Sequence, residues 1–93
     1  MTKYSVLLSR TSLNFLLKLD EKTKSRIKKS LKELETNPFL KRPCADIKQL
    51  SGSRDPVFYR MRIGNYRIIY AVEGKNVKIT EIITREKGYD WMN

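Results

Sequence analysis

Hydrophobic residues recur with a helical period in the first half of the chain and with a strand period in the second half. Residues 4–8 alternate between larger apolar side chains and smaller or polar ones, which predicts an opening strand. A short helix is expected next, because Thr11 and Ser12 are good N-cap residues. Its apolar face would carry Leu13, Leu16 and Leu17. We expect this face to pack on the sheet.

A second helix is predicted over residues 21–36. Asp20 can cap its first turn, and Asn37-Pro38 ends it because proline cannot continue the backbone hydrogen bonds. Its apolar stripe is formed by Ile27, Leu31 and Leu34. Lysines fill most of the remaining positions, and we interpret them as a solvated face whose field would still attract a polyanion. The two helices are expected to form a hairpin on one face of a sheet.

The second half of the chain has the pattern of strands. Residues 38–56 hold all three prolines and form an irregular connector, within which Ile47–Leu50 is predicted as a brief edge strand. From Val57 onward, three strand-like segments are separated by turns at Gly64-Asn65 and at Gly74. A chain of 93 residues has room for one core, so residues 1–93 are predicted to form one domain. The predicted fold is α+β, with about four antiparallel strands, a helical hairpin on one face, and the order β-α-α-β-β-β before a short C-terminal segment.

The Gly64-Asn65 turn determines which residues face one another across its hairpin. The predicted partners are Ile63 with Tyr66, Arg62 with Arg67, Met61 with Ile68, Arg60 with Ile69, and Tyr59 with Tyr70. Since side chains alternate between faces, the tyrosines and the other apolar members face the helices. We therefore expect Tyr59, Tyr66 and Tyr70 to pack in the core rather than stack on bases.

The opposite face of this hairpin gathers Arg60, Arg62 and Arg67. Like charges that face each other across two strands are destabilising, so we expect an anion among these guanidinium groups. Arginine suits a phosphate in particular, because its planar donors bind two oxygens at once. The alternative is that the three arginines form the ordinary solvated face of a half-exposed sheet.

The last strand is expected to contain a β-bulge. Strict alternation from Val77 and Ile79 would bury Glu81, whereas one extra residue near Thr80-Glu81 would turn Ile82 inward. The same bulge would bring Arg85 to the basic face. Tyr89 is close enough in sequence to reach the same pocket; alternatively, its ring anchors the C-terminus beside Trp91.

Composition limits the possible chemistry. Twenty Lys and Arg against ten Asp and Glu give a net charge of +10, so nucleic acid or an acidic protein is the expected partner. With no histidine and one cysteine, the chain can form neither an internal disulfide, nor a Cys/His zinc site, nor a histidine-based catalytic triad. We expect no metal or other cofactor. The sequence has no apolar run of membrane-spanning length and no signal peptide, which predicts a cytoplasmic protein without membrane contact.

Several segments resemble the RelE/ParE superfamily of bacterial and archaeal toxins. The resembling segments are IKQLSG, YRMRIGNYRIIY, and a last strand that ends in Arg85 with an aromatic residue shortly after. The resemblance covers essentially the whole chain and implies a RelE-like sheet with a basic cleft opposite the helices. By position, Arg67, Arg85 and Tyr89 match catalytic residues of the family, and Lys48 joins Arg60 and Arg62 as an RNA-binding residue.

The resemblance implies that the protein is the toxin of a type II toxin–antitoxin system. RelE-like members are endoribonucleases that cleave mRNA in the ribosomal A site and so inhibit translation. The implied reaction is metal-free attack of the 2′-hydroxyl on the adjacent phosphodiester, with Tyr89 as the base and Arg67 and Arg85 on the phosphate. Arg60 and Arg62 stand where some of these enzymes have lysine, and arginine cannot usefully release a proton near neutral pH.

The partner implied by the resemblance is an acidic RelB-like antitoxin, which would fold as it binds the toxin. Operator DNA would be contacted only through that complex. Two alternatives remain open at this point. One is a ParE-like toxin that inhibits DNA gyrase, and the other is a non-catalytic, basic nucleic-acid-binding module.

Overall fold

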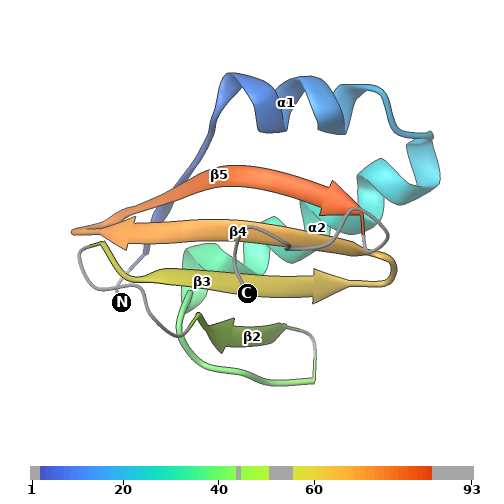
Figure 1. Cartoon of the computed structure of the whole chain (residues 1–93). Coiled ribbons are helices and arrows are strands. Elements are labelled where there is room, and N and C mark those ends of the chain that lie inside the picture. Colours follow the sequence, from blue (N-terminus) through green and yellow to red (C-terminus); the bar gives the residue numbers. More distant parts are fainter. Residues whose placement is uncertain (1–2, 44, 51–55, 85–93) are drawn as a thin grey trace.

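The computed structural model describes residues 3–43, 45–50 and 56–84. The chain forms a single sheet with helices packed on one face (Figure 1). The elements in chain order are β1 (Ser5–Leu8), α1 (Arg10–Leu17), α2 (Glu21–Thr36), β2 (Asp46–Gln49), β3 (Phe58–Ile63), β4 (Tyr66–Glu73) and β5 (Asn76–Thr84). This α+β architecture with a helical hairpin confirms the predicted fold.

The sheet differs from the expected one in two respects. It has five strands in the order β1-β5-β4-β3-β2, because the segment predicted as a brief edge strand pairs fully with β3. It is also mixed rather than antiparallel, since β1 runs parallel to β5 and only the other pairs are antiparallel. A parallel pair needs a long crossover connection, and the two helices that follow β1 begin that connection.

The helices follow the sequence pattern with two corrections, both in α1. The N-cap of α1 is Ser9, whose Oγ accepts the Ser12 N–H at 3.1 Å, so Thr11 and Ser12 lie inside the helix rather than capping it. Of the three residues predicted to form its apolar face only Leu16 is buried, whereas Leu13 and Leu17 are 41% and 57% exposed, so the expectation that the whole face packs on the sheet is wrong.

Helix α2 begins and ends where the sequence predicts. Asp20 caps it by accepting the Thr23 N–H at 3.1 Å. Its buried residues are Ile27, Leu31 and Leu34, as predicted. None of the described helices combines the length and the apolar composition that a membrane span needs.

The β3–β4 hairpin has the predicted register at every position. Ile63 pairs with Tyr66 across the two-residue turn, and Arg62 pairs with Arg67. Gly64 adopts a φ of +57°, which glycine reaches without the steric cost that a side chain would add.

The predicted bulge in β5 is present. Ile69 pairs with Glu81 and Tyr70 pairs with Ile79, so Thr80 is the extra residue. Ile82 is consequently turned into the core, where it is 4% exposed. Ser9 stabilises the bulge by donating a hydrogen bond from its Oγ to the Thr80 carbonyl at 3.1 Å.

The predicted packing role of the tyrosines is confirmed. Tyr70 is fully buried and its hydroxyl donates to the Pro38 carbonyl at 2.6 Å, while Tyr59 stacks on its ring at a centroid distance of 5.6 Å. Tyr66 packs edge-on against Phe15. Burial raises the pKa of the Tyr70 hydroxyl above its ordinary value, Tyr59 adds to this effect, and Arg42 opposes it.

Candidate nucleic-acid interface

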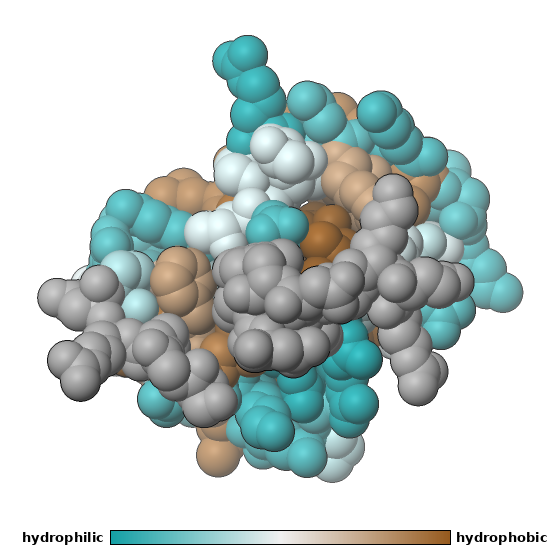
Figure 2. Space-filling view, in the orientation of Figure 1, coloured by the Kyte–Doolittle hydropathy of each residue, from teal (hydrophilic) through white to brown (hydrophobic). Residues whose placement is uncertain are grey.

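The three arginines predicted to share a face are brought together on the side of the sheet opposite α2. Arg60 and Arg62 are on β3, and Arg67 is the Cα partner of Arg62 on β4. A pocket of about 280 Å³ opens at this point, lined by Asp46, Arg62, Gly64 and Arg67. Figure 2 looks onto this side of the sheet, and hydrophilic side chains gather in its lower part, where Figure 1 places β2.

Asp46 on β2 occupies the centre of this cluster, and the sequence analysis did not identify it. Arg62 Nε donates to Asp46 Oδ2 at 2.8 Å, and Arg60 Nη1 lies 3.6 Å from Asp46 Oδ1. Lys41 Nζ is 3.8 Å from the same oxygen. The anion expected among the arginines is therefore supplied in part by the chain itself.

A sequence signal for Asp46 was present. Ile47 was expected to begin the edge strand, and an inward Ile47 requires outward side chains on either side of it. Extending the strand by one residue places Asp46 and Lys48 on the outward face, and the observed register then pairs Asp46 with Arg62 and Lys48 with Arg60.

Among the residues that the structure describes, the cluster keeps an excess of positive charge despite Asp46. One carboxylate lies within 3.8 Å of three cations, and Arg67 and Lys48 add two more on the same side of the sheet. Glu81 pairs with Ile69 and so faces the same side, but it forms no ion pair within the described residues. An added phosphate would therefore still meet net positive charge.

The arginines differ in their access to solvent. Arg60 has only 13% of its side chain exposed and also donates to the Asp46 carbonyl at 3.2 Å, so it is fixed between β2 and β3. Arg62 has 48% of its side chain exposed and lines the pocket together with Arg67. Lys48 is exposed on β2. Arg62 and Arg67 are therefore the residues best placed to contact a ligand in the pocket.

The surrounding cations keep Asp46 ionised. Partial burial opposes ionisation of its carboxyl, but the hydrogen bond and charge of Arg62, with the charges of Arg60 and Lys41, outweigh that effect. The pKa of Asp46 is consequently lower than its ordinary value. Asp46 thus remains a negative charge that orients the arginines rather than a proton donor near neutral pH.

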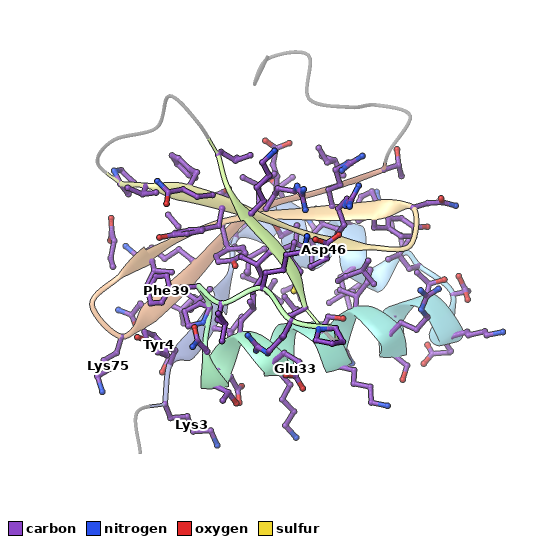
Figure 3. All side chains as sticks on the ribbon, turned by 90° about the horizontal axis from the view of Figure 1, so that it is seen from below. Lys3, Tyr4, Glu33, Phe39, Asp46 and Lys75 are labelled. Carbon is purple, nitrogen blue, oxygen red and sulfur yellow. The ribbon has the colours of Figure 1, made fainter. Side chains whose placement is uncertain are left out.

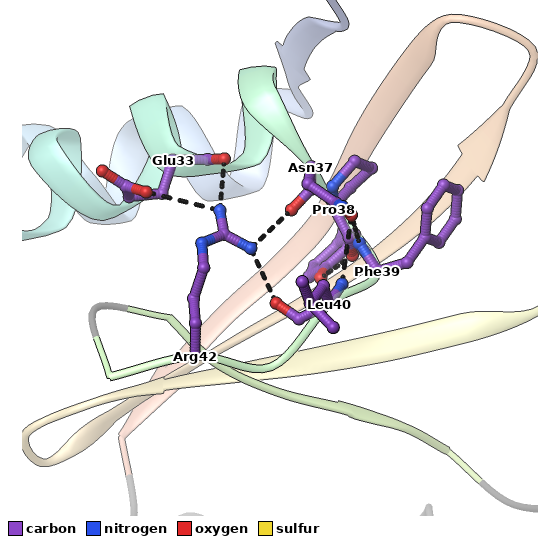
Figure 4. Close-up of polar contacts among 7 residues, drawn as sticks. Glu33, Asn37, Pro38, Phe39, Leu40 and Arg42 are labelled. Atoms are coloured by element: carbon purple, nitrogen blue, oxygen red, sulfur yellow. Dashed lines mark hydrogen bonds and ion pairs between the residues drawn. The ribbon is translucent and has the colours of Figure 1, made fainter.

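Arg42 fixes the connector that leads from α2 into β2 (Figure 4). Its Nη2 donates to the Glu33 carbonyl at 2.8 Å, and its Nη1 donates to the carbonyls of Asn37 at 3.0 Å and Leu40 at 2.6 Å. Three carbonyls at and after the end of α2 are thereby satisfied. The backbone of Arg42 also pairs with Ala45, the residue before β2, so Asp46 enters the sheet from a fixed connector. In Figure 3, α2 lies on one side of the sheet, with Glu33 labelled, and other side chains project from the opposite side.

Two of the predicted catalytic residues, Arg85 and Tyr89, lie outside the described residues. Within the described part of the chain, no group of His, Cys, Asp and Glu side chains is arranged to hold a metal ion.

Comparison with known proteins identifies the family. A family model described as the ParE toxin of the type II toxin–antitoxin system parDE matches residues 6–89. Toxin RelE3 of Methanocaldococcus jannaschii is 30% identical over 86 residues, which cover 92% of this chain and 96% of that protein. The chain therefore belongs to the RelE/ParE toxin superfamily. This confirms the predicted resemblance and makes the protein a RelE-like toxin of the type II toxin–antitoxin class.

Solved structures of RelE toxins have the same fold. The archaeal RelE–RelB complex from Pyrococcus horikoshii OT3 contains a chain that is 31% identical, with a TM-score of 0.79 over 95% of this toxin and 100% of that chain. A RelB–RelE antitoxin–toxin complex from Methanococcus jannaschii is 28% identical, with a TM-score of 0.72 over 94% of this toxin and 99% of that chain. A mutant of Escherichia coli RelE in the free state is 22% identical, with a TM-score of 0.70 over 92% of this toxin and 87% of that chain, and shares the fold.

Proposed function

We propose that this toxin is a ribosome-dependent endoribonuclease that cleaves mRNA in the A site and so inhibits translation in the cytoplasm. The observation that carries the proposal is the pocket lined by Arg62 and Arg67, which are cross-strand partners, together with Asp46. A phosphodiester in this pocket would relieve the repulsion between the arginines and accept their hydrogen bonds.

The proposed reaction is transesterification within the RNA. The 2′-oxygen forms a bond to the adjacent phosphorus, the bond from phosphorus to the 5′-oxygen breaks, and the products are a 2′,3′-cyclic phosphate and a 5′-hydroxyl. The 2′-hydroxyl proton passes to a base, and the leaving oxygen takes up a proton from solvent. Arg67 and Arg85 stabilise the negative charge that builds up on the phosphate, while Arg62 and Lys48 bind the RNA backbone. Arg60 holds Asp46, and through it orients Arg62.

Tyr89 is the proposed base. A phenol has an ordinary pKa of about 10, and guanidinium groups bound to the same phosphate would lower the pKa of a phenol placed beside them. We expect Tyr89→Phe to slow cleavage by roughly 100-fold while RNA binding stays within about twofold of the original, because the hydroxyl acts on the proton rather than on binding. Single-turnover cleavage on translating ribosomes and RNA-binding titrations measure the two effects. An unchanged cleavage rate would exclude Tyr89 from the mechanism.

The proposed inhibitor of the toxin is an acidic RelB-like antitoxin. Two of the solved relatives are complexes of RelE with RelB, and this toxin carries a net charge of +10 that an acidic partner would neutralise. Operator DNA would be bound only by the toxin–antitoxin complex. Growth arrest on expression of the toxin alone, relieved by the co-expressed antitoxin, is the expected result.

A second candidate function is inhibition of DNA gyrase, because the matching family model is that of the ParE toxin. The identity with two RelE toxins of Methanocaldococcus jannaschii, at 30% and 34%, favours the ribonuclease. Parallel assays of mRNA cleavage on translating ribosomes and of DNA supercoiling by gyrase separate the candidates. Cleavage with unaffected supercoiling supports the ribonuclease, and the reverse result would replace it with the gyrase inhibitor.

A further inference from the structure

A second basic site lies on the other side of the Gly64-Asn65 turn from the arginine pocket. It is a pocket of about 310 Å³ lined by Arg26, Lys29, Ser30, Glu33 and Ile63. The first four of these residues belong to α2, and Ile63 is the last residue of β3. The two pockets thus adjoin the same hairpin turn, one at Gly64 and the other at Ile63.

Arg26 is held directly against the turn. Its guanidinium atoms lie 3.2–3.7 Å from the position that a Cβ atom on Gly64 would occupy. The glycine therefore leaves room for the guanidinium group, and its φ of +57° is one that a residue with a side chain would adopt only with strain. Gly64 also lines the arginine pocket, so a single turn residue separates Arg26 from Arg62 and Arg67.

Arg26 belongs to a basic stripe along α2. Lys22, Arg26 and Lys29 are spaced by four and three residues, which places them on one side of the helix, and all three are exposed. Like charges at this spacing destabilise a helix. None of the three forms an ion pair within the described part of the chain. The next residue of the stripe, Glu33, instead has its carboxylate 3.3 Å from Arg42 Nη2.

We infer that Lys22, Arg26 and Lys29 form a second phosphate-binding surface, which holds the RNA backbone where it leaves the arginine pocket and passes the Gly64-Asn65 turn. The inference rests on the proposed function, because it takes the ligand of the arginine pocket to be RNA. Arg26 would bind a phosphate through its planar donors, and the two lysines would act as point charges beside it. The phosphodiesters are those of the mRNA beyond the scissile bond, because that strand is the one that leaves the arginine pocket.

The test compares two variants that each lose two positive charges from the same helix. Arg26→Gln/Lys29→Gln removes charges from the proposed surface, while Lys28→Gln/Lys32→Gln removes charges that line a different pocket, beside Leu13 and Leu17. The probes are a single-stranded RNA oligonucleotide, purified ribosomes, and polyglutamate as a model acidic polypeptide. Binding is measured over a range of salt concentrations, and cleavage is measured on translating ribosomes.

For the Arg26/Lys29 variant we expect the slope of log K against log salt concentration to fall by about 1.4, which corresponds to two phosphate contacts on a single strand. KM for cleavage should rise while kcat stays unchanged, because the surface binds ground state and transition state alike. The control variant should change the slope by less than half as much. Loss on the oligonucleotide supports the inference, whereas loss on ribosomes alone would assign the surface to ribosomal RNA and overturn it.

Three further results would overturn the inference. Equal losses in the two variants would mean that only the overall charge matters. Weaker binding of polyglutamate with unchanged RNA binding would make the surface a site for an acidic protein. If the unmodified toxin binds neither RNA nor ribosomes, both the proposed surface and the proposed ribonuclease function are wrong. If it binds and cleaves normally but the two variants lose binding equally, only the proposed surface is wrong.

Discussion

The two hairpins that share β4 have similar turns but opposite arrangements of charge. Both turns begin with a glycine of positive φ, +57° at Gly64 and +60° at Gly74. In the β4–β5 hairpin, Lys78 Nζ lies 2.6 Å from Glu73 Oε1, so the hairpin pairs its own charges. In the β3–β4 hairpin, Arg62 faces Arg67, and the carboxylate that contacts Arg62 comes from β2.

Because the two turns are alike, backbone geometry does not explain why Arg62 faces Arg67. A hairpin of this kind can bring an acid on one strand within ion-pair distance of a base on the other, as Glu73 and Lys78 show, and doing so is favourable. The β3–β4 hairpin keeps two arginines face to face instead and gathers further cations around them. The end of β4 nearest Gly64 is therefore the end that we expect to bind a polyanion, and the end nearest Gly74 is not.

The largest expected effect is that of Arg67→Ala. Removing a guanidinium from the phosphate site should lower the rate of mRNA cleavage by roughly 100-fold or more and weaken the salt dependence of RNA binding. Lys78→Ala removes one cation from the other hairpin and should leave cleavage within about twofold. Both rates are measured on translating ribosomes, with circular dichroism as a check on folding. Equal cleavage rates of the two variants would show that the two hairpins do not differ in function.

Alanine substitutions at Gly64 and Gly74 test whether the two turns differ in packing as well as in charge. Gly64→Ala and Gly74→Ala both force a side chain into the left-handed region, which costs about 1–2 kcal/mol of unfolding free energy. Gly64→Ala should cost more, because its Cβ would meet Arg26 at 3.2 Å while the space at Gly74 is open. Urea denaturation measures both costs, and a larger loss for Gly74→Ala would contradict the proposed packing of Arg26.

A smaller effect is expected for the carboxylates. Asp46→Asn should lower the free energy of unfolding by about 1 kcal/mol and tighten RNA binding, because it weakens a contact between β2 and β3 and releases Arg62. Glu73→Gln should cost less than about 0.5 kcal/mol, since that ion pair is half exposed on both sides. RNA binding that weakens in Asp46→Asn would show that the carboxylate serves the ligand rather than restraining the arginines.

The pH dependence of stability follows from the lowered pKa of Asp46. The folded chain releases the Asp46 proton at a lower pH than the unfolded chain does, so the contribution is fully present above the unfolded pKa, about 3.9, and is lost as pH falls through the lower folded pKa. The difference in stability between the original chain and Asp46→Asn should therefore shrink below about pH 4. Urea titrations of both chains between neutral and acidic pH measure this difference, and a constant difference would contradict the prediction.

Much of the fold follows from local patterns in the sequence. The alternation on either side of Gly64-Asn65 predicts the whole register of the β3–β4 hairpin, and the cost of burying Glu81 predicts the bulge at Thr80. The parallel pairing of β1 with β5 was not predictable in this way, because it joins distant segments that carry no shared turn signal. The cap of α1 was misplaced since Ser9, Thr11 and Ser12 are all cap-forming residues and only packing against the bulge selects Ser9.

The candidate site was predictable only where its residues belong to one local element of the chain. Arg60, Arg62 and Arg67 belong to one hairpin, so counting from its turn places them on one face. Asp46 and Arg26 come from β2 and α2, and their positions beside that hairpin depend on tertiary packing. The sequence thus predicts the cations of the pocket but neither the carboxylate that restrains them nor the second basic surface.

The central claim is that the arginine pocket binds the phosphate at which RNA is cleaved. The most direct test is to identify the RNA ends formed when the toxin is induced in cells. The original chain should produce new mRNA fragments with 5′-hydroxyl and 2′,3′-cyclic phosphate ends at positions occupied by the ribosomal A site, and Arg67→Ala should produce none. Growth arrest without such fragments, or the same fragments from Arg67→Ala, would contradict it.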